Sequence, residues 1–187
     1  MHIIQKEDTM IIVSGPDNSG KTSLISHLLA STNLVRIPKF NVLPPWEHPH
    51  EYAKWIRETL STGPVNGIVD RCFIDELVYG PVIRKRVSFS MTDWSLINGV
   101  YRTVKPLMII TDPGFDSIID TYRNREQYPS IDQNLEVRER YYEVVSSYPF
   151  DHAPLYFFNY NFDPGYTLVK SVIDYYIRRK ENEHQQL

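Results

Sequence analysis

Nine residues, 15–23, read GPDNSGKTS and fit the spacing G-x-x-x-x-G-K-[ST] of a phosphate-binding loop. Glycines let the backbone curl so that several N–H groups point at one anion, and a helix that begins there adds the positive end of its dipole. Lys21 supplies a cation for the outer phosphates, and Thr22 supplies a hydroxyl for Mg²⁺. We therefore predict that the ATP phosphates are bound by Gly15, Asn18, Ser19, Gly20, Lys21, Thr22 and Ser23.

The neighbours of this loop fit the same interpretation. The apolar run MIIV precedes it, and LISHLLAS follows it with apolar residues at helical spacing. A strand, a glycine-rich loop and a helix in this order are the context in which such a loop binds nucleotide. The alternative is a glycine-containing turn that matches the motif by accident. Such a turn would not need a strand before it and a helix after it.

A second polar pair, Asp70 and Arg71, follows the apolar run GIV. A carboxylate at the tip of a strand is where proteins with such a loop hold the metal ion, so Asp70 is expected near Mg²⁺ together with Thr22. The planar guanidinium of Arg71 suits bidentate binding of a phosphate. The alternative interpretation of this pair is a surface turn after a strand.

Two arginines, Arg123 and Arg125, lie in the polar stretch DTYRNREQYPS. On a closing flap, arginines neutralise the transferred phosphoryl group and exclude water, which protects the triphosphate from hydrolysis. We expect a small lid segment at about 122–131, with both arginines in catalysis alongside Lys21, Asp70 and Arg71. A solvated loop between two helices is the alternative.

Short apolar runs alternate with helical patterns along the chain, which predicts βαβ units and a parallel sheet. The expected strands are 10–14, 34–37, 67–70, 107–111 and 155–159. Expected helices follow the loop and cover 49–60, 73–85 with a break at Gly80-Pro81, 90–104, about 114–123, 130–145 and a last one from Asp163-Pro164. The prediction is an α/β, three-layer, doubly wound fold with a five-stranded parallel sheet, whose ligands bind at the carboxyl ends of the strands.

Composition fits one globular domain, 1–187, with 42% hydrophobic and 23% charged residues. A net charge of −3 gives no broad basic field for long nucleic acid, although 84–86 and 178–180 form local basic clusters. The single cysteine, Cys72, excludes an internal disulfide and suits a reducing cytoplasm, and we expect it to be a small buried side chain. We see no signal peptide or membrane span. The histidines of EHPHE, 47–51, indicate a turn into a helix rather than a metal site.

In four places the sequence resembles the thymidylate kinase family of nucleoside monophosphate kinases. The loop GPDNSGKTS is similar to the form with a carboxylate at its third position, which implies that Asp17 contacts the acceptor sugar. DRCFIDELVY looks like the pattern D-R-[YF]-x-x-S-x-x-A-Y, which implies that Asp70 serves metal and acceptor, Arg71 holds the acceptor phosphate and Tyr79 packs against the sugar. LVRIP and KPLMIITDP resemble the second strand and the strand before the lid helix.

The resemblance also favours a catalytic role for Arg123 and Arg125. Asn18 is not basic, and the family branch that shares this feature supplies its catalytic arginine from the lid. The sequence also departs from the pattern, with Asp75 in place of the usual serine and Gly80 where glutamine is common. Lys39 and Phe40 replace a common Glu-Arg pair, so Arg36, Lys39 and Phe40 are expected to contact the acceptor in a different way, and the base stays open.

Chemistry favours a phosphate acceptor over a hydroxyl acceptor. An anionic phosphate needs positive clamps and no general base, whereas a hydroxyl benefits from a carboxylate that takes its proton. The segment VRIPKFNVLPPW has basic residues and no acid before Glu47, although Asp70 or Asp17 remains available as a base.

We therefore expect a cytoplasmic kinase that transfers phosphate from ATP to a deoxynucleoside monophosphate, with Mg²⁺ as cofactor. The acceptor is dTMP, dUMP or a modified pyrimidine, and the resemblance implies a homodimer with 79–85 or 90–104 at the contact. The alternatives are a kinase for a hydroxyl on a deoxynucleoside or on a hydroxymethylated base in DNA, and a non-catalytic nucleotide-dependent binding module.

Overall fold

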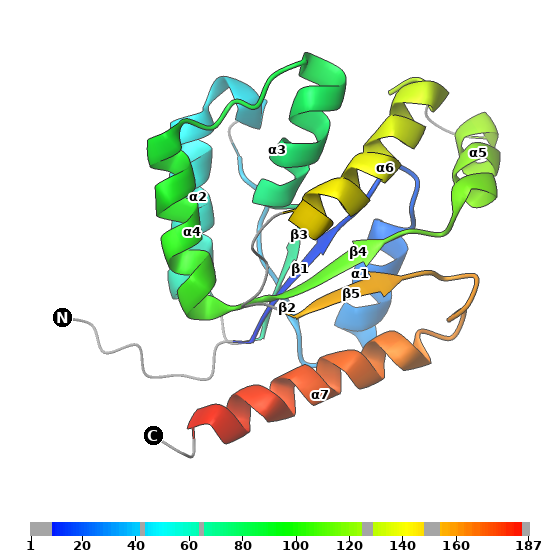
Figure 1. Ribbon diagram of the computed structural model, residues 1–187. Coiled ribbons are helices and arrows are strands. Elements are labelled where there is room, and N and C mark those ends of the chain that lie inside the picture. Colours follow the sequence, from blue (N-terminus) through cyan, green and yellow to red (C-terminus); the bar gives the residue numbers. More distant parts are fainter. Residues whose placement is uncertain (1–8, 42–43, 64–65, 125–128, 148–153, 185–187) are drawn as a thin grey trace.

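A five-stranded, fully parallel β-sheet forms the centre of the molecule (Figure 1). The computed structural model describes residues 9–41, 44–63, 66–124, 129–147 and 154–184. The strand order is β2-β3-β1-β4-β5. The strands are β1 (Met10–Ser14), β2 (Val35–Arg36), β3 (Gly67–Asp70), β4 (Leu107–Thr111) and β5 (Leu155–Phe158).

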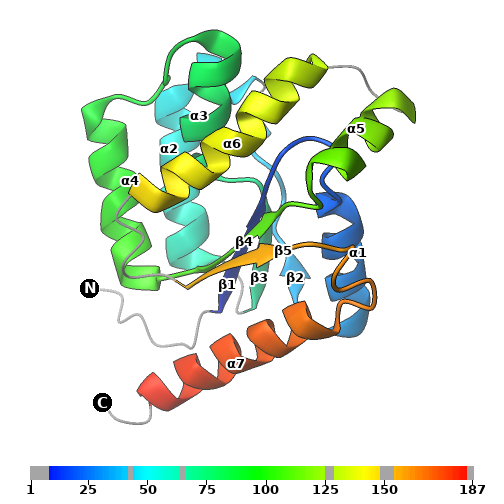
Figure 2. The ribbon, with the colours of Figure 1, turned by 45° about the vertical axis from the view of Figure 1, so that its right-hand side comes forward.

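Helices cover both faces of this sheet, which makes three layers (Figures 1 and 2). One face carries α1 (Lys21–Ser31) and α7 (Thr167–His184). The other carries α2 (Pro49–Thr62), α3 (Phe73–Tyr79), α4 (Met91–Val104) and α6 (Ile131–Ser147), and α5 (Phe115–Asn124) lies beside α6. Two short elements, the 3₁₀-helix η1 (Pro45–Glu47) and the π-helix η2 (Gly80–Arg84), precede α2 and follow α3.

Two hydrophobic cores result from the period of two along each strand. In β1, Met10 and Ile12 pack into the core beneath α2, α3, α4 and α6. Ile11 and Val13 point the other way, into the core beneath α1 and α7. All five β1 residues are buried, as expected for a central strand of a sheet covered on both faces.

The predicted elements are present, with local differences at their ends. The capping box at the start of α4 is confirmed, because Ser90 Oγ accepts from the Asp93 amide at 3.2 Å and the Asp93 carboxylate accepts from the Ser90 amide at 2.9 Å. The predicted break at Gly80 is the change from α3 to the π-helix η2. The prediction for the last helix was wrong in its start, because α7 begins at Thr167 and Asp163 precedes it.

Asp163 accepts hydrogen bonds from the backbone N–H groups of Thr167 at 2.8 Å and Val169 at 3.0 Å, so it caps the helix from outside.

Among the described residues, no helix is long and apolar enough to span a membrane.

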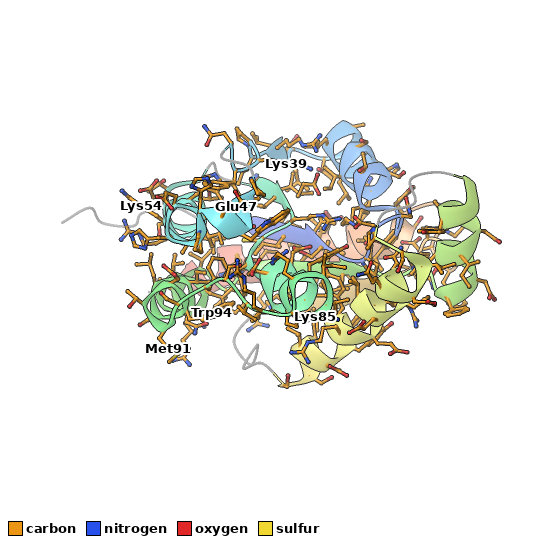
Figure 3. All side chains as sticks on the ribbon, turned by 90° about the horizontal axis from the view of Figure 1, so that it is seen from above. Lys39, Glu47, Lys54, Lys85, Met91 and Trp94 are labelled. Atoms are coloured by element: carbon orange, nitrogen blue, oxygen red, sulfur yellow. The ribbon has the colours of Figure 1, made fainter. Side chains whose placement is uncertain are left out.

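The order of strand addition reverses at β1, which has β3 on one side and β4 on the other, while all strands stay parallel. The loops after β1, β3 and β4 therefore meet at one edge, the usual ligand position in such sheets. Figure 3 shows the molecule from above, where Lys39 lies between the cyan helix α2 and the blue helix α1. Met91 lies at the outer edge of α4.

Candidate active site

The loop after β1 is curled by three residues with left-handed backbone. Gly15 has φ +146° and Gly20 has φ +86°, and Asn18 between them has φ +61°. A Cβ on Gly15 would lie 2.3 Å from Thr111 Oγ1, so the end of β4 leaves room only for glycine. The predicted phosphate-binding residues therefore form one continuous curl between β1 and α1, with Thr22 and Ser23 exposed in the first helical turn.

Lys21 folds back over its own loop. Its Nζ donates to Gly15 O at 2.8 Å and also to Pro16 O, and the residue is only 8% exposed. Burial, together with the positive charge of Arg71, lowers the pKa of Lys21 to about 7. The positive charge of Lys21 is thus only weakly compensated by its neighbours. The phosphates of a nucleotide bound at this loop would supply the missing negative charge.

Asp70 lies at the carboxyl end of β3 with two cations around it. Lys39 Nζ lies 2.8 Å and Arg36 Nη2 lies 3.2 Å from Asp70 Oδ2. The carboxylate is buried, whereas both cationic side chains are about half exposed. The predicted metal-side carboxylate and the two predicted acceptor residues are therefore in direct contact.

Arg71 is held on three sides. Its backbone has φ +70°, which is unusual for a residue with a side chain, and its N–H donates to Val13 O at 2.9 Å. One guanidinium nitrogen donates to Asp17 Oδ1, another lies 3.6 Å from Asp75 Oδ1, and the group stacks 4.9 Å above the Tyr79 ring.

These neighbours keep the guanidinium charged. Burial by itself lowers the pKa of Arg71, but Tyr79, Asp75 and Asp17 outweigh it and raise that pKa well above its usual value. Burial raises the pKa of Tyr79, so its ring stays neutral beneath the guanidinium. Strand β3, helix α3 and the loop after β1 together aim Arg71 at one point.

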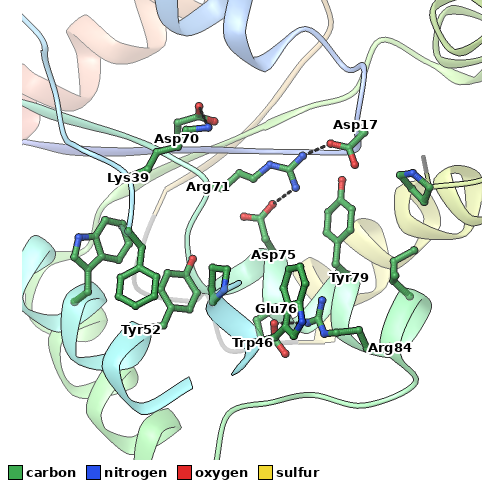
Figure 4. Close-up of a pocket in the computed structure, with 15 residues that line it drawn as sticks. Asp17, Lys39, Trp46, Tyr52, Asp70, Arg71, Asp75, Glu76, Tyr79 and Arg84 are labelled. Atoms are coloured by element: carbon green, nitrogen blue, oxygen red, sulfur yellow. Dashed lines mark hydrogen bonds and ion pairs between the residues drawn. The ribbon is translucent and has the colours of Figure 1, made fainter. Parts of the chain in front are cut away.

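A pocket of about 520 Å³ opens beside this arginine (Figure 4). Asp17, Lys39, Asp70 and Arg71 line the end next to the phosphate-binding loop. Aromatic rings line a second wall. The centre of the Phe40 ring lies 5.1 Å from that of Tyr52 and 5.9 Å from that of Trp55. The whole lining is Asp17, Lys39, Phe40, Pro45, Trp46, Tyr52, Trp55, Asp70, Arg71, Asp75, Glu76, Tyr79, Ile83, Arg84 and Pro129.

The far end of the pocket holds a buried ion pair that the sequence did not suggest. Arg84 donates to Glu76 Oε2 and lies with its guanidinium 4.7 Å from the centre of the Trp46 ring. Glu76 Oε1 also accepts from the Ser88 amide at 2.7 Å. The expected basic cluster 84–86 is therefore split, because Arg84 turns inward while Lys85 and Arg86 are exposed.

The lid prediction falls largely on residues outside those described. Arg123 belongs to the last turn of α5, with no description of its side chain, and Arg125 lies outside the described residues. The base of this region is fixed by Asp112, which accepts from Arg138 Nε at 2.8 Å and Nη2 at 2.9 Å, and also from the Tyr142 hydroxyl. Burial alone would raise the pKa of Asp112, but these hydrogen bonds hold it below its usual value.

Helix α6 also contacts the phosphate-binding loop, which sequence reasoning missed. The Tyr141 hydroxyl lies 3.2 Å from Gly15 O and donates to Asp75 Oδ1 at 2.6 Å. Asn134 Nδ2 donates to Asp17 O at 3.3 Å. No local pattern predicts these contacts, because the partners are more than 60 residues apart in the sequence and both α6 residues look like ordinary helix positions.

Two other sequence expectations have clear outcomes. Cys72 is fully buried, and burial raises the pKa of its thiol to about 12, which fits a packing role. The EHPHE stretch leads into α2 as expected, with His50 Nδ1 3.0 Å from Asp93 Oδ1. Within the part of the chain that the structure describes, no group of three or more histidine, cysteine or acidic side chains could hold a metal ion.

Several solved structures share this fold. The YorR protein of Bacillus subtilis, solved with phosphorylated GDP, is 19% identical, and the likeness covers 95% of this chain and 98% of that chain with a TM-score of 0.68. Deoxyadenosine kinase of M. mycoides, solved with dCMP and dCDP, is 14% identical over 96% of this chain and 100% of that chain, with a TM-score of 0.54. Polyphosphate kinase 2 of Arthrobacter aurescens is 13% identical over 82% of this chain and 62% of that chain, with a TM-score of 0.55.

These likenesses show the fold of phosphate-binding-loop kinases. No protein-family model matches the chain, and no curated protein matches it in sequence.

Proposed function

We propose that this protein transfers a phosphoryl group from ATP to a deoxynucleoside monophosphate, with dTMP, dUMP or a modified pyrimidine nucleotide as acceptor. One observation carries the proposal. Asp17 of the phosphate-binding loop is hydrogen-bonded to Arg71, and both line the 520 Å³ pocket, so a donor phosphate site and a nucleoside-sized pocket share a wall. Phosphoryl transfer needs this juxtaposition, because the acceptor must lie in line with the donor's last phosphate.

Each predicted residue has a role in this proposal. Lys21 and the loop amides hold the donor phosphates, Arg71 clamps the acceptor phosphate, and Tyr79 packs against its sugar. Arg36 and Lys39 add positive charge beside the same subsite, and the ring of Phe40 belongs to the wall where the base would lie. Arg123 and Arg125 are proposed to close over the transferred group.

Mg²⁺ fits the groups present. The exposed Thr22 hydroxyl and the Asp70 carboxylate are the hard oxygen donors that this ion prefers, and they come from the loop after β1 and the tip of the neighbouring strand β3. Thr22 and Asp70 would hold the ion, which would supply positive charge beside the donor phosphates. When the metal and nucleotide bind, Lys39 and Arg36 are available to turn from Asp70 toward the acceptor.

A specific observation favours a second candidate, a hydroxyl acceptor on a deoxynucleoside or in DNA. Arg71 already faces two carboxylates, Asp17 and Asp75, which weakens its attraction for a phosphate dianion. Asp17 is a carboxylate next to the transfer point and would serve as the general base for a hydroxyl. The neighbours in structure include a deoxyadenosine kinase, whose name states a deoxynucleoside acceptor, so a kinase of this fold can act on a hydroxyl acceptor.

An acceptor panel tests the proposal. The protein is given Mg-ATP labelled at the γ-phosphate and, separately, dTMP, dUMP, dCMP, dGMP, the 2′-hydroxyl form of TMP, thymidine, and DNA that contains hydroxymethyluracil. A labelled diphosphate from a deoxypyrimidine monophosphate supports the proposal and identifies the base. Label on thymidine or DNA transfers the conclusion to the second candidate, and ATP binding without transfer to any acceptor would indicate a non-catalytic binding module.

Variants divide the roles further. We expect Arg71→Ala to raise the acceptor KM more than it lowers kcat, because it removes a clamp on the bound acceptor. Lys21→Ala is expected mainly to lower kcat, because its charge acts on the transferring phosphates. Equal changes in both parameters for both variants would contradict this division.

A further inference from the structure

Asp75 is a buried carboxylate at the point where three elements meet. It lies in the first turn of α3 and is 9% exposed. Its Oδ2 accepts from Ser14 Oγ of β1 at 2.7 Å and from the Cys72 amide at 3.0 Å, and its Oδ1 accepts from the Tyr141 hydroxyl of α6 at 2.6 Å. Four lone-pair positions thus receive three donors, and Arg71 Nη1 lies 3.6 Å from Oδ1.

Asp17, the other carboxylate on Arg71, has a different environment. Its side chain is 32% exposed, whereas that of Asp75 is 11% exposed. Arg71 is the hydrogen-bond donor to the Asp17 carboxylate among the described residues, and Asp17 lies on the curled loop that must adapt to nucleotide. Figure 4 shows the guanidinium between the two carboxylates, with one dashed line to each.

We propose that Asp75 is a positioning residue that fixes the guanidinium of Arg71 at the acceptor subsite, while Asp17 is the partner that Arg71 exchanges for substrate. The inference rests on the proposed function, in which Arg71 binds the acceptor. Asp75 is immobile because its partners come from β1, α3 and α6 and because its charge lies at the positive end of α3. Asp17 has no such anchoring.

This division explains how one arginine serves both states of the site. Without substrate, Arg71 has both carboxylates and its buried charge is compensated. When an acceptor phosphate replaces Asp17, Asp75 still fixes the orientation of the guanidinium, so its free edge points into the pocket. Serine at this position, as in the pattern the sequence resembles, would carry no charge to hold Arg71.

The chain offers a matched control for Asp75. Asp93 is also buried, also lies at the third position of its helix, α4, and also accepts from the backbone N–H of its N-cap residue, Ser90. Asp93 does not line the pocket. Asp75→Asn and Asp93→Asn therefore remove the same helix-capping charge, but only the first removes a partner of Arg71.

Steady-state kinetics with the preferred acceptor test the inference. We expect Asp75→Asn to raise the acceptor KM about ten-fold, a typical size for coupled neighbours, with the KM for ATP unchanged. Asp93→Asn is expected to lower the melting temperature to a similar extent and to leave the acceptor KM as in the wild type. Asp75→Ser, which removes the charge and leaves a smaller polar side chain, serves as the second variant if Asp75→Asn folds poorly, with the same expected rise in KM.

A double-mutant cycle separates positioning from a general structural effect. If Asp75 acts through Arg71, Asp75→Asn should add no further rise in KM in the Arg71→Ala background. An acceptor KM within two-fold of wild type for both Asp75 variants, or fully additive effects with Arg71→Ala, would overturn the inference.

A substrate-free measurement keeps this result distinct from a failure of the proposed function. In nitrogen-15 NMR of the unliganded protein, a guanidinium fixed by two carboxylates rotates slowly and gives separate Nη signals for Arg71. We expect separate signals in the wild type and in Asp93→Asn, and merged signals in Asp75→Asn. Merged signals in the wild type would refute the positioning role even if the kinase activity is confirmed, whereas separate signals with no acceptor turnover would refute only the kinase proposal.

Discussion

The buried pair of Glu76 and Arg84 should stabilise the far wall of the pocket only as a complete pair. Its side chains are 7% and 16% exposed, and Arg84→Met removes the cation while it retains most of the volume. Glu76 then keeps its hydrogen bond from the Ser88 amide. Loss of one partner of a buried pair costs about 3–5 kcal/mol, because the other charge remains without compensation.

The magnitude expected here is the lower end of that range, about 3 kcal/mol, since Glu76 keeps one backbone hydrogen bond and faces an open pocket. For a chain of this size, that loss corresponds to a fall in the melting temperature of about 6–12 °C. Adding Glu76→Gln removes the uncompensated charge, so the double variant should recover to within about 1 kcal/mol of wild type.

Urea unfolding of the wild type, both single variants and the double variant measures these free energies, with the m-value as a check that each unfolds in the same way. Arg140→Met is the matched control, because Arg140 forms an exposed pair with Glu143 on α6 and should lose less than about 0.5 kcal/mol. If Arg84→Met costs less than about 1 kcal/mol, or if the double variant is no more stable than Arg84→Met, the pair does not stabilise the far wall of the pocket.

Three further predictions concern the edge of the sheet where the loops meet. Gly15→Ala should destabilise the fold by about 3 kcal/mol and abolish ATP binding in calorimetry, because its Cβ would clash at φ +146°, whereas Gly99→Ala in α4, with open space, should stabilise by about 0.5–1 kcal/mol. The depressed pKa of Asp112 contributes stability above the unfolded-state pKa of 3.8 that is lost as pH falls below it, so Asp112→Asn or Arg138→Met should flatten the acid limb of a stability–pH curve. An unchanged acid limb in both variants would contradict the role of the Asp112–Arg138 pair. Arg71→Ala should weaken binding of the identified acceptor by about 2–3 kcal/mol in calorimetry, the size of a lost bidentate charged contact, and an unchanged affinity would count against its role as the clamp.

Much of the fold could be predicted because its signals are local. The strands are short apolar runs, and β3 and β4 have the predicted bounds. Ser90 and Asp93 form the predicted cap, and Gly80-Pro81 interrupts α3 because proline lacks an amide hydrogen. The helix was predicted to start at Asp163, four residues before the observed start of α7 at Thr167, since Asp163 caps the helix across a turn rather than as its direct neighbour.

The donor side of the site was predictable for the same reason, and most of the acceptor side was not. The phosphate-binding loop is one contiguous motif, whereas the pocket wall combines Trp46, Glu76 and Arg84 from separate elements. Arg84 reads as part of a basic surface cluster, and only the π-helical turn, with its changed angular spacing, directs it inward. No periodicity in the sequence predicts that π-helical turn.

The position of β1 at the centre of the sheet explains why distant residues act on one loop. β3 brings Arg71 to Asp17, β4 places Thr111 against Gly15, and α6 adds Tyr141. Each of these contacts restrains a different side of the curl, and Asn134 restrains the backbone of Asp17, so the Asp17 carboxylate is the group of the loop that we propose to exchange its partner. If Arg71 binds the acceptor as proposed, an acceptor bound there would act on the proposed donor loop, because the two proposed subsites share the Asp17–Arg71 hydrogen bond.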